Sequence, residues 1–528
     1  MAMTGAAVTA PARTGALRWW ALGAVVLAVL AVGLDLTVLS VALPTLAGAL
    51  KASESDLQWF SSGYALVLAA AMLPAGLLGD RYGRKKVMLA SLALFAAGSL
   101  ACAYSRTEGE FIAARVLLGV AGAGVVVMAV SALAVLFSEE ERPKAVGIWA
   151  AANMIAFPVG PILGGWLLSR YWWGWVFVMN VPVAVVGFAA VAALVPESSA
   201  AERPGFDMVG IVSSSAGLVA LTYGLIEAGQ HGWGSAGALA WILAGLTVIV
   251  AFFAWEQAVE RRGGQPLLDL ALFGSAAFTW GVILFTVLTL ALVGLLFTMP
   301  QYFQGVIGTS PEGSGIRLLP VVGGLLAGLL PAAFIAKKIG AKLTIAAGFA
   351  VLGAGLGLGA ATTAASGEGF AAAWMAIAGV GTGLTMATAA SAALGELTEE
   401  RAGVGSGVLQ ALKNTGVPLG AAILGSALTS AYVSRLVLAG RPPAAAHAAR
   451  QSMFGGVAVA RALHSAAVLA TVRAAFVHGM DIALIVSAGF AVAGIVLALI
   501  FMPARPGPPA GTRPDPRGGD RVAARHPA

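Results

Sequence analysis

The chain has 528 residues, of which 59% are hydrophobic and only 10% charged, whereas soluble domains carry about 25% charged residues. This composition excludes an ordinary soluble protein. The 31 Lys and Arg outnumber the 24 Asp and Glu, and in a membrane protein such an excess marks cytoplasmic loops rather than a nucleic-acid partner. A single cysteine, Cys102, excludes an intrachain disulfide. The five histidines lack the spacing of a metal site, so we expect no bound metal.

Fourteen apolar segments follow one another along the chain, each long enough to cross about 30 Å of hydrocarbon. They predict helices rather than barrel strands, because the runs are continuously apolar instead of alternating. The predicted spans are 19–43, 60–78, 87–104, 111–137, 145–168, 175–195, 209–227, 238–255, 277–299, 316–336, 343–363, 370–394, 404–431 and 481–502.

The positive charges predict the orientation of these spans. If the N-terminus is cytoplasmic, 20 of the 31 Lys and Arg lie on the cytoplasmic side, 9 lie outside and 2 lie within spans. Five of the outside arginines belong to the region after the thirteenth span and oppose this assignment, but the other loops agree with it. With fourteen spans, both termini are then predicted to be cytoplasmic.

The loop between the second and third spans mixes glycines and charges: Gly76, Gly79, Asp80, Arg81, Gly83, Arg84, Lys85 and Lys86. Glycines permit a tight turn and close helix approach, and a carboxylate among basic residues can form a charged latch at a helix end. The stretch resembles the signature loop of the major facilitator superfamily, G-x-L-x-D-R-x-G-R-K. This resemblance implies that Asp80, Arg81 and Arg84 gate the cytoplasmic side by holding the two halves together. The alternative is a basic loop explained by the positive-inside rule alone.

An internal repeat supports the same resemblance. Aligning Gly83 with Gly340 places Lys337, Lys338 and Lys342 opposite the signature loop, and duplicated halves suit a transporter whose bundles rock about a central site. We predict an all-α polytopic membrane protein with the major facilitator fold and 14 transmembrane helices. Its parts are a cytoplasmic segment 1–18, a six-helix bundle 19–195, two inserted helices 209–255, a six-helix bundle 277–502 and a disordered cytoplasmic tail 503–528. The extracellular loop 432–475 is expected to carry a short helix or hairpin.

Three further stretches are similar to the fourteen-span drug:proton antiporters of that superfamily: Leu34–Pro44, Gly160–Gly165 and Trp173–Pro182. The second stretch holds the antiporter motif residues Gly160, Pro161, Gly164 and Gly165. Ser40, Ala156 and Gly174 depart from the family patterns. The resemblance implies that the motif prevents uncoupled leakage. The alternative is that its small residues let the fifth helix pack closely on a neighbour, and the two interpretations are compatible.

Ionisable residues at membrane depth are functional candidates. Asp35 of the first span and Arg115 of the fourth both fall in the outer half of the membrane, and the resemblance assigns the arginine to the proton site. Burial disfavours the charged form of a carboxyl and a nearby arginine favours it, so a movement that changes either effect can load and unload a proton. We therefore predict that Asp35 carries the coupling proton and that Arg115 modulates the acidity of Asp35. The alternative is a static ion pair or a packing contact.

Three other polar residues are weaker candidates. Glu227 closes the seventh span and Asp481 opens the fourteenth, where plain interfacial charges are expected. Lys413 of the thirteenth span lies deeper. It can snorkel, pair with a polar group or contact an anionic substrate.

These features predict a proton-coupled antiporter that exports small, largely apolar drugs or antibiotics across the cytoplasmic membrane of a bacterium. We expect a monomer that is not an enzyme, whose partners are a small-molecule substrate, protons and the lipid bilayer. It would need no cofactor, because the sequence lacks the G-x-x-x-x-G-K-[ST] motif for ATP. Two alternatives stay open. One is an importer or facilitator of a small solute on the same fold. The other is a non-transporting membrane sensor or enzyme, although the short loops offer no catalytic region.

Overall fold

A computed structural model describes residues 16–137, 141–199, 207–262, 264, 267–268, 270–395, 399–438 and 442–503. Within these ranges the regular structure is helical. Most of the predicted N-terminal segment 1–18 and almost all of the predicted tail 503–528 lie outside the described residues.

The N-terminal bundle contains seven helices that account for the first six predicted spans. Ser53 and Thr107 cap two of them by accepting hydrogen bonds from backbone N–H groups of the first turn. The helices are α1 (Ala16–Ala49), α2 (Glu54–Tyr82), α3 (Arg84–Ala103), α4 (Glu108–Leu136), α5 (Arg142–Arg170), α6 (Trp175–Val178) and α7 (Asn180–Leu194).

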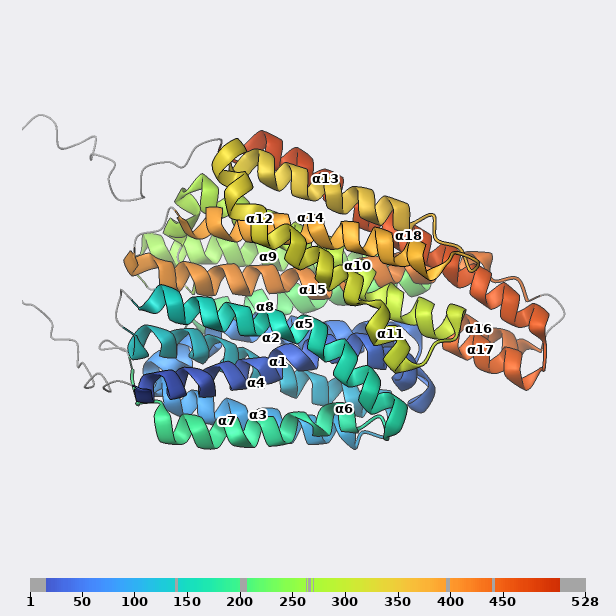
Figure 1. Cartoon of the computed structure of the whole chain (residues 1–528), viewed down its shortest axis with the longest axis horizontal. Helices are drawn as coiled ribbons and strands as arrows, with labels where there is room; N and C mark the ends of the chain where they lie inside the picture. The colour runs from blue at the N-terminus through green and yellow to red at the C-terminus, as the bar shows by residue number, and fades with distance from the viewer. Residues whose placement is uncertain are drawn as a thin grey trace, which may run out of the picture.

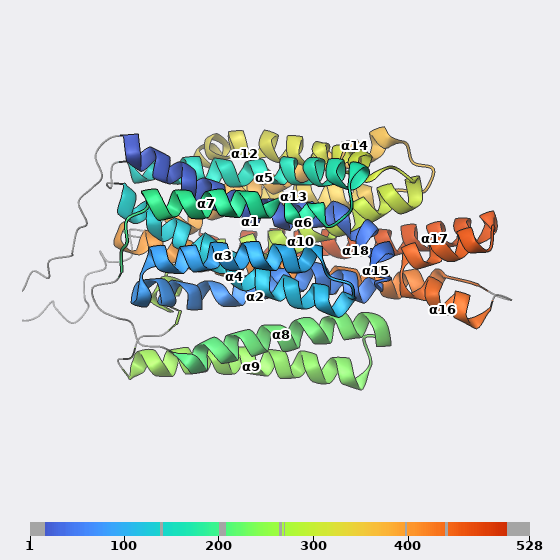
Figure 2. The same cartoon turned by 90° about the horizontal axis from the view of Figure 1, so that it is seen from below.

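The inserted pair, α8 (Met208–His231) and α9 (Ala236–Arg261), lies beside the bundle rather than within it (Figure 2). Helix α8 contacts the long helix α15 (Glu399–Arg435). There, Ser426 Oγ donates a hydrogen bond to the Leu225 carbonyl at 2.6 Å. The two inserted helices are thus attached to the side of the molecule.

The C-terminal bundle begins with the 3₁₀ helix η1 and contains the π-helical segment η2. Its elements are η1 (Leu270–Gly274), α10 (Ala276–Gln301), η2 (Tyr302–Ile307), α11 (Pro311–Arg317), α12 (Leu319–Ile339), α13 (Ala341–Gly359), α14 (Glu368–Gly395), α15, α16 (Pro443–Gln451), α17 (Met453–Ala462) and α18 (Ala466–Phe501). The long helices of both bundles run roughly side by side along one direction (Figure 1).

Each of the fourteen predicted spans coincides with a helix. Among the described residues, twelve helices are long and apolar enough to cross a membrane, and α2, bent by 46° before Pro74, makes a thirteenth. Helix α5, with 29 residues, occupies the remaining predicted span. The structure is therefore a multi-span, all-helical membrane protein.

The start of the fourteenth span was predicted wrongly. Helix α18 begins at Ala466 instead of 481 and has 36 residues, because Ser465 caps it and the polar residues Arg473 and His478 are accommodated within it. Asp481 consequently lies inside α18 rather than at its start. The loop predicted at 432–475 contains two short helices, α16 and α17, which project at one end of the molecule (Figure 1).

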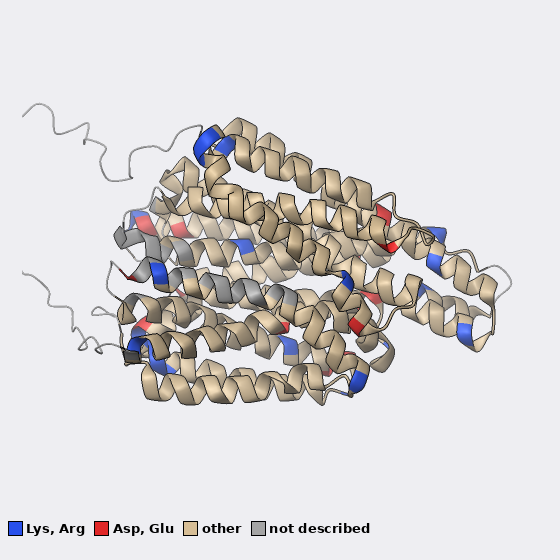
Figure 3. Cartoon of the chain, in the orientation of Figure 1, with Lys and Arg blue, Asp and Glu red and all other residues tan. Residues whose placement is uncertain are grey.

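The bundle of helices has two ends, called the motif end and the far end. The motif end holds the turn at Gly83 between α2 and α3, and the far end holds α11. Buried apolar side chains form one large cluster in each half, around Phe60 and Phe95 in the N-terminal bundle and around Phe349 and Trp374 in the C-terminal bundle. Among the described residues, charged residues gather toward the two ends of the ribbon, and few lie between them (Figure 3).

Candidate functional site: a buried ion pair in the N-terminal bundle

The candidate site lies where α1 and α4 face each other. Asp35 of α1 and Arg115 of α4 form an ion pair with 2.5 Å between Oδ2 and Nη1. The two residues are 2% and 0% exposed, so both charges are removed from solvent and lipid. Charges are tolerated at such a site only when they are paired and hydrogen-bonded. The structure thus brings into contact two candidates that lie 80 positions apart in the sequence.

Three further residues surround the pair. Asn180, the first residue of α7, donates Nδ2–H to Asp35 Oδ1 at 3.1 Å. The Phe60 carbonyl of α2 accepts from Arg115 Nε at 3.1 Å, and the guanidinium carbon lies 4.3 Å from the centre of the Tyr64 ring. The cluster therefore ties together α1, α2, α4 and α7.

Some polar groups of the cluster have a hydrogen-bond partner among the described residues and others have none. Both carboxylate oxygens of Asp35 accept a hydrogen bond. Arg115 Nη2 and Tyr64 Oη are buried and form no hydrogen bond with a described residue. A buried donor without a partner is costly, and Arg115 Nη2 is therefore free to donate to a second acceptor.

Asn180 and Tyr64 were not selected from the sequence as site residues. Asn180 lies within the stretch Trp173–Pro182, and Tyr64 carries no charge that marks it as costly in a membrane. The sequence signal for Asn180 is its place in that motif. In the structure it is a hydrogen-bonding residue directly after the short break between α6 and α7.

The antiporter-motif glycines pack α5 against α1 beside Asp35. A Cβ at Gly160 would lie 2.9 Å from Thr37 Cβ, and one at Gly164 would lie 2.7 Å from Val38 Cγ1. Thr37 Oγ1 also donates to the Ala156 carbonyl at 3.0 Å. Close packing was one interpretation of these glycines, and the structure places that contact two to three residues from the buried carboxylate.

A neighbouring face of α5 contacts the C-terminal bundle. A Cβ at Gly165 would lie 2.6 Å from the Pro311 carbonyl oxygen, and one at Gly315 would collide with the Pro161 carbonyl. Arg170 and Glu312 form an ion pair of 2.9 Å close by. Helix α5 is therefore packed between α1, which carries Asp35, and α11 of the other half.

More polar contacts join the halves toward the far end. Gln304 Nε2 donates to the Val41 carbonyl at 3.0 Å. Gln301 Nε2 donates to the buried Glu54 carboxylate at 3.2 Å. These contacts hold the two bundles together at this end.

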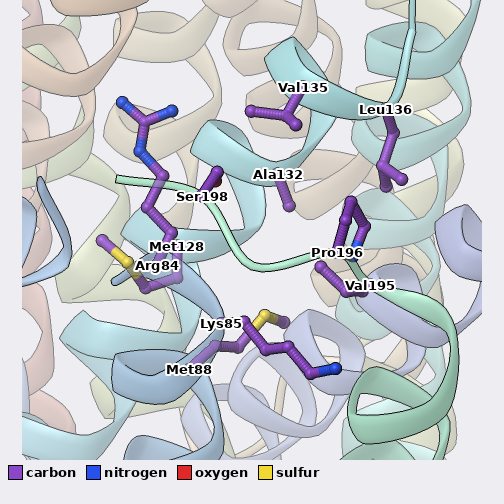
Figure 4. Close-up of a pocket in the computed structure, with 10 residues that line it drawn as sticks. All are labelled: Arg84, Lys85, Met88, Met128, Ala132, Val135, Leu136, Val195, Pro196 and Ser198. Atoms are coloured by element: carbon purple, nitrogen blue, oxygen red, sulfur yellow. The ribbon is translucent and has the colours of Figure 1, made fainter. Parts of the chain in front are cut away.

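The signature loop at the motif end packs on its own half. Asp80 and Arg84 form an ion pair of 2.8 Å, and Lys85 Nζ donates to the Ala192 carbonyl of α7 at 2.6 Å. The Arg84 and Lys85 side chains point away from each other beside a small pocket that Met88 and Met128 also line (Figure 4). The contacts of Asp80, Arg84 and Lys85 thus join α2 and α3 to the end of α7. A latch between the halves stays a prediction.

The two turns aligned in the internal repeat have similar backbone geometry. Gly83 ends α2 and precedes α3 with φ of 111°, and Gly340 ends α12 and precedes α13 with φ of 86°. Residues with a Cβ rarely adopt such positive φ angles. The local backbone conformation therefore explains the glycine at this turn in each half.

The weaker candidates lie apart from the ion pair. Glu227 pairs with His231 at 2.9 Å at the end of α8. The ammonium of Lys413 lies 5.3 Å from the centre of the Phe285 ring and forms no ion pair with a described residue. Asp481 Oδ1 is buried and accepts no hydrogen bond within the described part of the chain.

The fold and the comparisons together define the class of protein. A family model described as Major Facilitator Superfamily matches residues 25–421. The chain belongs to this superfamily of membrane transporters, so it is a transporter and not an enzyme.

Three relatives have drug-related names. The chain is 31% identical over 500 residues to the tetracenomycin C resistance and export protein of Streptomyces glaucescens, covering 92% of each chain. It is 31% identical over 502 residues to the multidrug efflux pump LfrA of Mycolicibacterium smegmatis, covering 92% of this chain and 97% of that one. It is 30% identical over 479 residues to the methyl viologen resistance protein SmvA of Salmonella typhimurium, covering 88% and 94%.

Solved structures share the fold at low sequence identity. A bacterial homolog of the human lysosomal transporter Spinster, in an inward-facing and unoccupied conformation, matches with a TM-score of 0.68 and 14% identity over 93% of this chain and 98% of that one. A D-xylose-proton symporter matches with a TM-score of 0.58 and 14% identity over 92% and 98%. These likenesses extend along nearly the whole chain.

Proposed function

We propose that the chain is a proton-driven antiporter that exports small, largely apolar drugs or antibiotics across the cytoplasmic membrane of a bacterium. The observation that carries this proposal is the buried pair of Asp35 and Arg115. Two to three residues beyond Asp35, α1 packs against α5, the helix that reaches the other half. The drug-related names of the relatives support export as the direction. The excess of positive charge in the loops at the motif end supports placing both termini in the cytoplasm.

In the proposed cycle, a proton adds to Asp35 Oδ2 and breaks the ion pair. The carboxyl becomes neutral, and the freed Arg115 guanidinium keeps its hydrogen bond to the Phe60 carbonyl and its contact with the Tyr64 ring. The tie between α1 and α4 is thereby weakened. When the proton leaves toward the cytoplasm, the ion pair forms again, so the net result is one proton moved inward.

The loosened α1 transmits the change through α5. Its residues Thr37 and Val38 pack on Gly160 and Gly164, and a neighbouring face of α5 packs on α11. A shift of α1 against α4 therefore displaces the contact that holds the halves together at the far end. The antiporter motif then acts through close packing, and the seal it provides opposes leakage.

The proton gradient supplies enough energy for such a cycle. One charge crossing 100 mV provides about 2.3 kcal/mol, and one unit of pH difference adds about 1.4 kcal/mol. Their sum supports a gradient of roughly 500-fold for a neutral substrate moved against one proton. We propose that no cofactor is needed and that the transporter works as a monomer.

The test is Asp35→Asn, which removes the titratable group and keeps the shape of the side chain. Wild-type and variant protein are reconstituted into vesicles with an imposed pH gradient, and transport of ethidium, a monovalent apolar cation, is followed by fluorescence. We expect gradient-driven transport to fall to background, while exchange of labelled for unlabelled ethidium without a gradient continues. Glu260→Gln, which removes an exposed carboxylate of α9, should leave both rates unchanged.

Two results would contradict the proposal. Full gradient-driven transport by Asp35→Asn would remove Asp35 from the coupling step. Movement of the substrate in the same direction as the proton would make the protein an importer. If Asp35→Asn loses exchange as well as driven transport, Asp35→Glu is measured next. This variant retains a carboxyl group and should restore both activities.

A further inference from the structure

A second site is suggested by a cavity of about 420 Å³ at the far end, away from the buried ion pair. Its wall is formed by the end of α1, the end of η2, and the helices α17 and α18. Pro44 lines it and lies nine residues beyond Asp35, or about 13 Å along the axis of α1. The volume falls in the range of small-molecule sites.

Two arginines give this cavity its charge. Arg461, in the last turn of α17, and Arg473, near the start of α18, both line it, and none of the described residues in its wall is Asp or Glu. Neither arginine forms an ion pair with a residue that the structure describes. Two like charges that share a cavity repel each other, so an anion between them would relieve that repulsion.

One of these guanidinium groups is held in place. Arg473 Nε donates to the Gly305 carbonyl of η2 at 3.2 Å, and its two Nη atoms make no hydrogen bond with a described residue. A fixed guanidinium with free N–H donors is suited to carboxylate, sulfonate or phosphate groups, which it binds through charged hydrogen bonds.

The remaining wall has a mixed character. Phe454, Val457 and Leu469 contribute apolar surface, and Gln304 and Thr309 add neutral polar side chains. A ligand that matches all of this surface has an acidic group for the arginines and an apolar body for the other side chains.

We propose that this cavity binds an amphiphilic anion, with its acidic group between Arg461 and Arg473 and its apolar body against Phe454, Val457 and Leu469. The anion can be free in solution or can be the headgroup of an acidic lipid, since both present the same chemistry. The site is separate from Asp35 and Arg115, and its occupancy does not depend on proton-driven export. A failed transport test would therefore leave this proposal standing.

The test measures binding at equilibrium. The full chain is placed in nanodiscs of phosphatidylcholine and titrated by calorimetry with dodecyl sulfate below its micellar concentration, and with dodecanol as the neutral analogue. We expect saturable binding of the sulfate that is weaker by about tenfold or more in R461Q/R473Q, the loss typical of charged hydrogen bonds. R461K/R473K, which keeps the charge, should retain most of the binding.

Arg450→Gln is the matched control, because Arg450 is an exposed arginine of the neighbouring helix α16 that does not line the cavity. It should leave the affinity unchanged. Equal affinity of wild type and R461Q/R473Q, or equal binding of dodecyl sulfate and dodecanol, would overturn the proposal. Phosphatidylglycerol added to the nanodiscs identifies the source: competition indicates a lipid headgroup, and unchanged dodecyl sulfate binding indicates a free anion.

Discussion

Each half of this transporter contains a tight contact between two of its own helices, and the two contacts have opposite chemistry. In the N-terminal bundle, α1 and α4 meet at the buried charges of Asp35 and Arg115. In the C-terminal bundle, α12 and α14 meet through Gly324, Gly328 and Gly379. The first contact depends on a group that can gain a proton, whereas the second contains no titratable group.

The glycine contact brings two helix backbones against each other. A Cβ at Gly328 would lie 2.9 Å from the Val380 carbonyl carbon, and one at Gly383 would lie 2.8 Å from Leu329 N. Small residues four apart permit this approach in membrane helices, where van der Waals packing replaces the hydrophobic drive. The glycines and backbone atoms of this contact carry no titratable group, so protonation cannot alter it.

This difference suggests a division of labour between duplicated halves. In the proposed cycle, a proton loosens α1 from α4, while α12 and α14 keep their contact and move as one body. The N-terminal bundle would then convert proton binding into motion, and the C-terminal bundle would provide the surface against which α5 moves.

The largest effect is expected for Arg115→Met, which leaves the Asp35 carboxylate buried without its partner. Breaking a buried ion pair from one side costs about 3–5 kcal/mol, so the free energy of unfolding should fall by that amount, as measured by chemical unfolding in mixed micelles. The double variant D35N/R115M should be more stable than Arg115→Met alone, because the unpaired charge is gone. A single variant as stable as the wild type would show that the pair is not a structural tie.

A smaller effect is expected for Gly328→Ala. The added methyl overlaps the backbone of α14, and overpacking of this kind costs about 1–3 kcal/mol. Gly323→Ala on the same helix is the matched control, since nothing lies within 4 Å of its new Cβ. The midpoint of thermal unfolding should fall for Gly328→Ala and hold or rise for Gly323→Ala. Equal midpoints would show that the backbones of α12 and α14 can move apart to admit the methyl, and would contradict a tight contact at Gly328.

The sequence predicted the helices well because a membrane span is a local property. A run of about 20 apolar residues identifies itself without knowledge of its neighbours, and all fourteen runs coincide with helices. The start of α18 was missed because Arg473 and His478 interrupt the apolar pattern. In the structure α18 extends beyond the apolar run, and Arg473 lies beside a cavity.

The site was predictable only in part. Asp35 and Arg115 were individually visible, because charge in an apolar span is costly. Their direct contact, the donor from Asn180 and the ring of Tyr64 depend on how four helices pack, and no local pattern contains that information. The cavity between Arg461 and Arg473 was hidden for the same reason, since the sequence places both arginines in an apparent loop.

The smallest effect is expected for Asn180→Ala, which removes the second hydrogen bond to the Asp35 carboxylate. Hydrogen bonds between membrane helices average about 0.6 kcal/mol and reach about 1.7 kcal/mol, so the free energy of unfolding should fall within that range. In the Asp35→Asn background the same substitution should cost less, because the amide no longer faces a charged acceptor; the difference is the coupling energy. An equal cost in both backgrounds would assign Asn180 to packing at the break between α6 and α7 rather than to the Asp35 carboxylate.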